Sequence, residues 1–341
     1  MIHIYTDFLI REILAYSFPK SPITTVFIGG GTPTSLPLDV MDKLLHALGK
    51  LPLCPKTEVT VECNPGTLSK DYLTLLKNQN VNRLSFGLQS IDDCELHTMG
   101  RIHTFDEFLH NYSMAREAGF ININIDMMFN LPGQKISAFS QGLSTVVALE
   151  PQHISCYSLT PAENTPLWNE IKTGKTILQC DETDRAMYHA AKKLLKQSGY
   201  IHYEISNFCK PGFSCKHNTD LWQHQPYIGF GLGAHSFDGA KRWCNPSSFE
   251  DYFNNNKDTC VSLSKSDLQA EAVLLGLRFV DGISDDEFFV KHGFRPSVVY
   301  ETQLEHLIKR GLIQCNGDMY ALTSYGLDVA NQVFLSFIGE A

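Results

Sequence analysis

Polar and glycine residues stand where five short apolar runs of this sequence end. In chain order these groups are GGGT at residues 29–32, Glu62, the pair Gln89-Ser90, Asp126, and SLT at residues 158–160. A carboxylate can bind an ammonium group or sugar hydroxyls, and the backbone N–H groups of glycines can approach an anionic group closely. If the five runs lie side by side, these residues predict one shared site for a small molecule.

The glycine group raises the question of which ligand it approaches. It follows the stiff apolar run at residues 25–28 and continues as TPT. GGGTP matches neither the phosphate loop GxxxxGK[ST] nor the dinucleotide pattern GxGxxG. Pro33 also blocks a smooth entry into a helix of the dinucleotide-binding type. A tight turn between strand and helix, without any ligand, is the simpler alternative.

The elements that must position these residues alternate between strand and helix. The apolar runs predict strands at residues 25–28, 58–62, 83–87, 121–126, 153–159 and, more weakly, 202–205. Helical periodicity predicts helices at residues 40–48, 69–79, 105–118, 138–149 and 181–197. Thr104 with Glu107 forms a capping-box pattern, Ser69 is a plausible N-cap, and Gly119 and Gly199 stand where helices end. Repeated βα units predict a parallel sheet, doubly wound or a barrel, with function at the carboxyl ends of its strands.

The pattern changes after about residue 210. Residues 211–260 are rich in Gly, Asn, His and aromatic residues, and we expect an irregular connector there. Helices are predicted at residues 267–279, 285–292 and 296–310, followed by a strand pair within 313–322 and a last helix at 324–337. Helices followed by a small hairpin resemble a winged-helix fold. The predicted domains are therefore residues 1–208, the connector 209–262 and the C-terminal region 263–341.

Composition excludes several classes of function. The chain of 341 residues is 43% apolar, enough for a large core, and its net charge of −9 with no basic stripe argues against nucleic-acid binding. No apolar stretch is long enough to span a membrane, and the first residues lack the pattern of a secretory signal. The ten scattered cysteines form no CxxC pattern, which favours reduced thiols. We expect a cytoplasmic protein.

Several motifs, in order, resemble the radical S-adenosylmethionine (SAM) proteins of the oxygen-independent coproporphyrinogen III oxidase family. They are VFIGGGTPTSL, VTVECNPGT, NRLSFGLQSID with MGRIHT, NINIDMMFNLPGQ and HISCYSLT. The later stretch KHNTDLWQHQPYIGFGLGAHSF and the ending YALTSYGLDVANQVFLSF are similar to the heme-chaperone branch of that family, HemW. The resemblance runs from about residue 25 to the end of the chain. It implies an incomplete (β/α) barrel with SAM across the strand ends.

The resemblance also implies which residues contact SAM. Gly30, Gly31 and Thr32 fall where the family binds the methionine end of SAM. The other matching positions are Glu62, Gln89, Arg101, Asp126, Thr160 and Phe237, of which Thr160 and Phe237 match the most loosely. Glycine N–H groups and Arg101 suit a carboxylate, and an acidic side chain suits the ammonium or the ribose hydroxyls.

A second implied site concerns heme. The heme chaperones carry HNxxYW, and here the stretch is HNTDLW at residues 217–222, with leucine in place of tyrosine. By resemblance His217 is a candidate ligand of heme iron and Trp222 a candidate contact of the porphyrin; imidazole is a usual axial ligand. A lone histidine in a loop is otherwise most often a surface or capping residue, and His235 is the alternative iron ligand.

The sequence departs from the family in one respect. The family holds a [4Fe–4S] cluster through CxxxCxxC after its first strand, and this chain has no such motif and no cysteine before Cys54. MIHI imitates the first strand, but residues 5–16 read as the helix that should follow the cluster loop, and a strand needs about 2–6 residues to enter its helix. We expect a truncated or mis-started chain; a genuine cluster-free relative is the alternative.

Three functions follow from these observations. The first is a HemW-like chaperone that binds heme and transfers it to client heme proteins, meets membranes only through those clients, and is not itself expected to be an enzyme. The second is an oxidase-like enzyme that decarboxylates coproporphyrinogen III. The third is a cluster-free SAM-binding module. The HNTDLW and GAHS stretches and the C-terminal ending favour the first. No catalytic residue is assigned.

Overall fold

The structure is a computed structural model that describes residues 1–18, 21–254 and 259–338, so that residues 255–258 of the predicted connector lie outside it. The chain forms two compact units. The barrel unit comprises Phe18–His202 and Ser206–Cys215, and the C-terminal unit comprises Met1–Ser17, Tyr203–Ile205 and Lys216–Ala341. The predicted three-domain division places its boundaries elsewhere and remains a prediction.

A curled seven-stranded sheet in the order β1-β2-β3-β4-β5-β7-β6 forms the half-barrel. Its strands are β1 (Ile23–Ile28), β2 (Leu53–Cys63), β3 (Arg83–Gln89), β4 (Asn122–Phe129), β5 (His153–Ser158), β7 (Asn207–Cys209) and β6 (Ile201–Glu204). Strands β1 to β5 are parallel, and β7 pairs antiparallel with β5. The prediction of an incomplete (β/α) barrel is confirmed.

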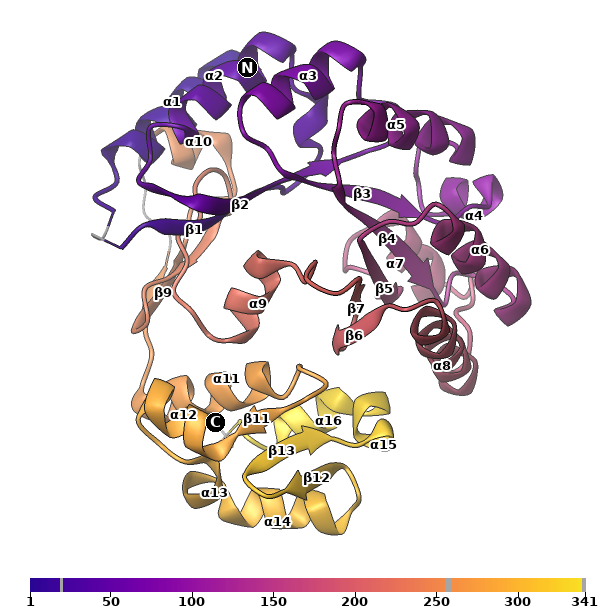
Figure 1. The fold of residues 1–341 in the computed structure, drawn as a ribbon, viewed down its shortest axis with the longest axis vertical. Helices are drawn as coiled ribbons and strands as arrows, with labels where there is room; N and C mark the ends of the chain where they lie inside the picture. Colours follow the sequence, from indigo (N-terminus) through magenta and orange to yellow (C-terminus); the bar gives the residue numbers. More distant parts are fainter. Residues whose placement is uncertain (19–20, 255–258, 339–341) are drawn as a thin grey trace. The chain divides into compact units, whose positions relative to one another are not determined.

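Helices cover the outer face of this sheet (Figure 1). Between its strands the barrel unit contains the short 3-10 turn η1 (Pro33–Ser35) and the helices α2 (Leu38–Leu48), α3 (Lys70–Asn78), α4 (Asp93–Thr98), α5 (Phe105–Glu117), α6 (Ile136–Ala148), α7 (Pro166–Lys172) and α8 (Asp181–Gln197). Side chains of β3 alternate: Leu84 and Phe86 pack in the core with the helices, and Arg83 and Ser85 point to the other face. The ring of Phe86 lies 5.8 Å from that of Phe108 on α5.

The helix boundaries follow from local chemistry that the sequence shows. The Ser69 hydroxyl accepts from the backbone N–H of Tyr72, and Thr104 and Glu107 form both bonds of a capping box. Gly119 and Gly199 have φ of +82° and +78°, the left-handed conformation that ends a helix. These predicted start and stop signals are confirmed.

The C-terminal unit contains two small sheets and the remaining helices. The N-terminal helix α1 (Ile2–Ala15) belongs to it, as do α9 (Lys216–Trp222), the sheet β10-β9-β8 and α10 (Phe249–Phe253). The strands of that sheet are β8 (His235–Phe237), β9 (Lys241–Cys244) and β10 (Cys260–Ser262). No described helix is long and apolar enough to cross a membrane.

Residues from 265 onward form a helical layer with a second small sheet in the order β11-β13-β12. Its elements are α11 (Lys265–Gly276), β11 (Ile283–Ser284), α12 (Asp285–His292), α13 (Pro296–Val299), α14 (Glu301–Lys309), β12 (Ile313–Asn316), β13 (Met319–Leu322), α15 (Ser324–Asp328) and α16 (Ala330–Leu335). Val273, Leu307 and Val333 form part of one buried cluster in this layer. The predicted helices and hairpin are therefore present here.

Three sequence predictions were wrong in detail. The expected irregular connector contains α9, α10 and a three-stranded sheet. The MIHI stretch, which only imitates a strand, is helical from Ile2 onward and forms the start of α1. The helices predicted at 296–310 and 324–337 are each broken in two, at Tyr300 and Val329, and helices α4 and α7 were not predicted. Short elements of this kind owe their conformation mainly to tertiary packing, which local periodicity does not report.

Candidate functional site

The glycine turn after β1 lies against the carboxylate of Glu62. The Gly30 N–H donates to Glu62 Oε2 over 3.2 Å. A Cβ atom on Gly29 would lie 2.8 Å from the Glu62 carboxyl carbon, so a larger residue there would displace that carboxylate. Gly30 and Gly31 have φ of +81° and +135°, and a Cβ on either would meet nothing within 4 Å. The turn is thus exposed and shaped by its glycines, which answers why they follow a stiff strand.

Asp126 and Glu62 form a pair of mutually repelling carboxylates at the strand ends. Burial raises the pKa of Asp126, and hydrogen bonds from Ser155 and Asn124 oppose this. The Asn124 amide donates to Asp126 Oδ1 over 2.7 Å. Burial also raises the pKa of Glu62, and the charge of Asp126 raises it further. A ligand cation placed near this pair would relieve the repulsion.

Gln89 is held by a hydrogen bond, and Arg101 lies close enough to Asp126 to affect the pKa of that carboxyl group. The Tyr157 hydroxyl on β5 donates to Gln89 Oε1 over 3.1 Å, and Gln89 has an unusual φ of +72° at the end of β3. The positive charge of Arg101 lowers the pKa of Asp126, so both belong to the same electrostatic environment. Thr32 accepts a hydrogen bond of 2.8 Å from the Asn64 amide. The barrel unit therefore brings the predicted residues of β1 to β4 to one end of its sheet.

The two remaining predicted SAM contacts are Thr160 and Phe237. Thr160 is an exposed residue after the end of β5. Phe237 belongs to the C-terminal unit, where it is buried on β8 and stacks on the ring of His224 at 4.5 Å. Their role as SAM contacts stays a prediction.

The candidate heme residues lie on α9 in the C-terminal unit. His217 is near the start of this helix and is partly exposed, and Trp222 is its last residue. The guanidinium of Arg278 lies 4.0 Å from the centre of the Trp222 ring, so that face of the ring is covered. His235, the alternative ligand, is exposed on β8.

Within the described ranges, no three His, Cys, Asp or Glu side chains come together to hold a metal ion. The two cysteines nearest the strand ends, Cys63 and Cys156, are fully buried, and burial raises the pKa of both thiols well above the usual range. A cluster needs thiolates, and these side chains stay protonated.

The same strand ends do fit the polar groups of SAM. An open glycine turn offers N–H groups to a carboxylate, and the repelling pair Glu62 and Asp126 suits an ammonium or hydroxyl groups. Sequence reasoning missed Asn124 and Tyr157, which support Asp126 and Gln89. The sequence carried a signal for both residues, because polar and apolar residues alternate along these two strands and Asn124 and Tyr157 occupy polar positions.

Comparison with known proteins assigns the chain to a family. The sequence model of the radical SAM superfamily matches residues 2–141, and that of the HemN C-terminal domain matches residues 263–329. The heme chaperone HemW of Bacillus subtilis is 35% identical over 327 residues, 93% of this chain and 86% of that protein. The HemW of Lactococcus lactis is 32% identical over 99% of this chain and 90% of that protein. This chain belongs to the HemW family of the radical SAM superfamily.

The fold agrees with this assignment. The solved structure of coproporphyrinogen III oxidase (HemN) from Escherichia coli superposes with a TM-score of 0.84, covering 98% of this chain and 83% of that chain at 20% identity. At this identity the likeness shows the fold alone. The family resemblance drawn from the motifs is confirmed.

Proposed function

We propose that this chain binds heme and transfers it to client heme proteins, as the name of its relatives describes for them. The observation that carries the proposal is the 35% identity with a heme chaperone HemW, which extends over 93% of the chain. Identity of this extent covers the barrel unit and the C-terminal unit alike. Heme and client proteins are the proposed partners. A cytoplasmic location, and contact with membranes only through clients, stay predictions.

His217 is the proposed axial ligand of the heme iron. It stands on α9 and is partly exposed. A neutral imidazole supplies the nitrogen that heme iron prefers, and a position on a helix holds that nitrogen more firmly than a loop would. Trp222 is proposed to contact the porphyrin only through the part of its ring that Arg278 does not cover.

The barrel unit is proposed to bind SAM through Gly30, Gly31, Thr32, Glu62, Gln89, Arg101 and Asp126. In the superfamily a [4Fe–4S] cluster supplies the electron that cleaves SAM. The 341 residues contain no CxxxCxxC motif, and we propose that heme binding by this chain does not depend on a cluster. The residues listed here orient SAM and hold its charged groups. Without the metal chelate we expect that binding to be weak, and we assign no catalytic residue.

The oxidase function is not proposed. Its support would be the likeness to the Escherichia coli enzyme, and that likeness at 20% identity concerns the fold. Decarboxylation by radical chemistry also needs a cluster, and the described residues do not offer its ligands. Heme binding requires only a suitable axial donor and an apolar surface.

Heme titration of the purified chain tests the proposal. Without reconstituted iron and sulfide, the chain should bind heme and give a Soret band, and His217→Ala should weaken binding at least about tenfold or shift that band. The control is His235→Ala, the exposed histidine of β8, which should change the spectrum less. Far-UV circular dichroism checks that both variants fold. An unchanged heme spectrum in folded His217→Ala would contradict the ligand assignment.

A further inference from the structure

The turn that ends helix α9 has an unusual backbone. The N–H groups of Gln223, His224 and Gln225 donate to the carbonyls of Thr219, Leu221 and Asp220 within 3.0 Å, and so complete the helix. His224 adopts a φ of +55°, a left-handed conformation that is rare for residues other than glycine and asparagine. Such a conformation persists only where the surroundings hold it, so the side chain of His224 deserves a structural explanation.

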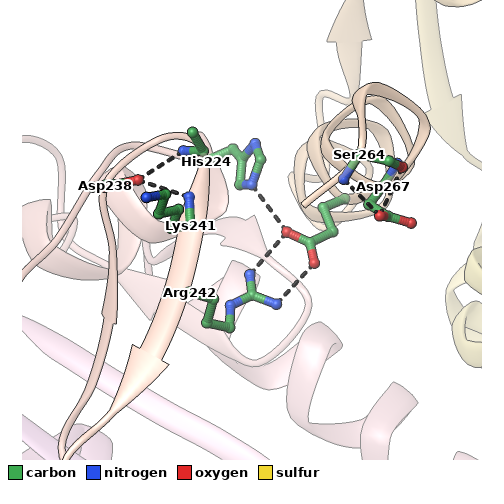
Figure 2. Close-up of polar contacts among 8 residues, drawn as sticks. His224, Asp238, Lys241, Arg242, Ser264 and Asp267 are labelled. Atoms are coloured by element: carbon green, nitrogen blue, oxygen red, sulfur yellow. Dashed lines mark hydrogen bonds and ion pairs between the residues drawn. The ribbon is translucent and has the colours of Figure 1, made fainter. Parts of the chain in front are cut away.

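Glu271 on α11 supplies that explanation (Figure 2). Its Oε2 lies 3.1 Å from Nε2 of His224, and its two oxygens accept hydrogen bonds of 2.8 Å each from the guanidinium of Arg242 on β9. The His224 side chain is only 7% exposed and stacks on Phe237. Because a carboxylate only accepts, the imidazole must present Nε2–H to it, which fixes the orientation of the ring.

The partners of Glu271 are themselves fixed. Asp238 accepts hydrogen bonds from the backbone N–H groups of Ala240 and Lys241 and so holds the hairpin turn that leads into β9. Ser264 and Asp267 form the capping box that starts α11 (Figure 2). The guanidinium therefore projects from a strand whose preceding turn is held in place, and the carboxylate projects from the middle of a helix whose start is capped.

Two further contacts join the same end of α9 to the region after residue 263. Arg278, just past α11, covers the Trp222 ring and forms an ion pair of 3.4 Å with the buried Glu204. The Lys291 ammonium on α12 donates to the Gln223 side chain over 3.0 Å. Three consecutive residues at the end of α9 are thus each held by a different side chain of the C-terminal region.

We propose that Glu271 is a positioning residue for heme coordination: through His224 it sets the orientation of α9, and α9 carries His217. This inference rests on the proposed function, because it concerns how the proposed ligand is held. It assigns a role to the region that matches the HemN C-terminal domain, residues 263–329, which contributes Glu271, Arg278 and Lys291. That region acts as the support of the heme-binding helix.

The rate of heme release tests the proposal. Heme-loaded protein is mixed with excess apomyoglobin as heme acceptor, and the Soret change is followed for the parent chain, Glu271→Ala, the near-isosteric Glu271→Gln, and His217→Ala. We expect release to be about tenfold faster in Glu271→Ala and faster, to a smaller degree, in Glu271→Gln. The control Glu305→Ala removes an exposed carboxylate that pairs with Lys309 on α14, and its release rate should equal that of the parent.

A double-mutant cycle separates positioning from a general loss of stability. If Glu271 acts through His224, the release rate of His224→Ala with Glu271→Ala should match that of either single variant and not multiply their effects. If Glu271→Ala does not fold by circular dichroism, Glu271→Gln decides. Parent-like release in the folded Glu271 variants, with a clear effect of His217→Ala, would overturn this inference alone. A His217→Ala variant that binds heme as the parent does would overturn the proposed function, and this inference with it.

Discussion

Asp126, a proposed SAM contact, opposes the stability of the protein that carries it. Its pKa is raised, chiefly because it is buried, and the nearby Glu62 carboxylate has a raised pKa partly through its charge. A raised pKa means that the folded state prefers the protonated acid. At pH values above the pKa of the folded state, the ionised form therefore lowers the free energy of unfolding. Such strain is common where side chains are kept for a ligand.

Asp126→Asn should stabilise the protein without ligand and weaken SAM binding. A raised pKa stabilises the folded state at pH values below the ordinary pKa of aspartate. This stabilisation is lost as the pH rises through the pKa of the folded state. The variant should therefore exceed the parent in free energy of unfolding at pH 7, by about 1 kcal/mol, and this gain should shrink toward pH 4. Urea denaturation at both pH values measures it, and calorimetry should show weaker SAM binding.

The exposed Asp281 offers a matched control for this substitution. Asp281→Asn removes the same charge from the surface and should leave both the pH dependence and SAM binding unchanged. An Asp126→Asn variant that is less stable than the parent at pH 7 would show that the hydrogen bonds to Asp126 outweigh the cost of its burial.

At the scale of elements, helix α1 fixes the glycine loop that precedes β8. Glu12 accepts from the Gly231 N–H over 3.0 Å and from the hydroxyl of Tyr252 over 2.6 Å, and the Tyr5 hydroxyl accepts from the Leu232 N–H over 3.3 Å. A Cβ on Gly231 would lie 2.5 Å from the Tyr5 hydroxyl. The GLGAHS stretch is therefore explained here by packing against α1.

Replacing Gly231 separates this close packing from backbone strain. Gly231→Ala should lower the free energy of unfolding by about 2–4 kcal/mol, because a left-handed conformation and a steric clash combine. Gly233→Ala is the matched control: its φ is +63°, but a Cβ there meets nothing within 4 Å, so only about 1–2 kcal/mol should be lost. Thermal and urea unfolding compare the two. Equal losses would mean that the contact with Tyr5 adjusts without cost.

The sequence predicts most elements of the half-barrel and of the region after residue 263, and few of those between residues 210 and 262. Strands such as β4 and helices such as α8 have strong periodicity, and caps such as Thr104 mark their ends. The carboxyl ends of parallel strands lie at the same edge of a sheet, and on this basis the sequence correctly predicted that Glu62, Gln89 and Asp126 lie at one end of the half-barrel. It could not show the contact between Glu271 and His224 at the end of α9, because a contact between residues 47 positions apart has no local pattern. The same holds for α9 itself, whose seven residues depend on packing.

At the scale of the whole molecule, the two units are interleaved along the chain. The C-terminal unit takes residues from the start, the middle and the end of the sequence, and the barrel unit takes the segments between them. Helix α1 therefore stabilises residues near 231–252, although it immediately precedes the first strand of the half-barrel. Changes in α1 should consequently appear in the C-terminal unit.

Amide hydrogen exchange tests this division. Glu12→Ala leaves the Gly231 N–H, the Tyr252 hydroxyl and the Asn245 amide without their carboxylate acceptor, a loss of about 1–3 kcal/mol. Exchange should accelerate in peptides covering residues 229–235 and 249–253, and peptides from β2, β3 and β4 should exchange as in the parent. Faster exchange spread evenly over both units would instead mean that they unfold together.

Because the two units alternate along the chain, the contacts within each unit can form only in a certain order during synthesis. Glu12 leaves the ribosome long before its partners Gly231 and Tyr252, which follow 219 and 240 positions later. Barrel-unit strands β1 to β5 lie between them and can pair while α1 still has no surface to pack on. Glu271 is synthesised later still. A nascent chain can therefore complete the strand ends that carry Glu62 and Asp126 before the helix that carries His217 is secured, so we expect heme to bind only after Glu271 has been synthesised.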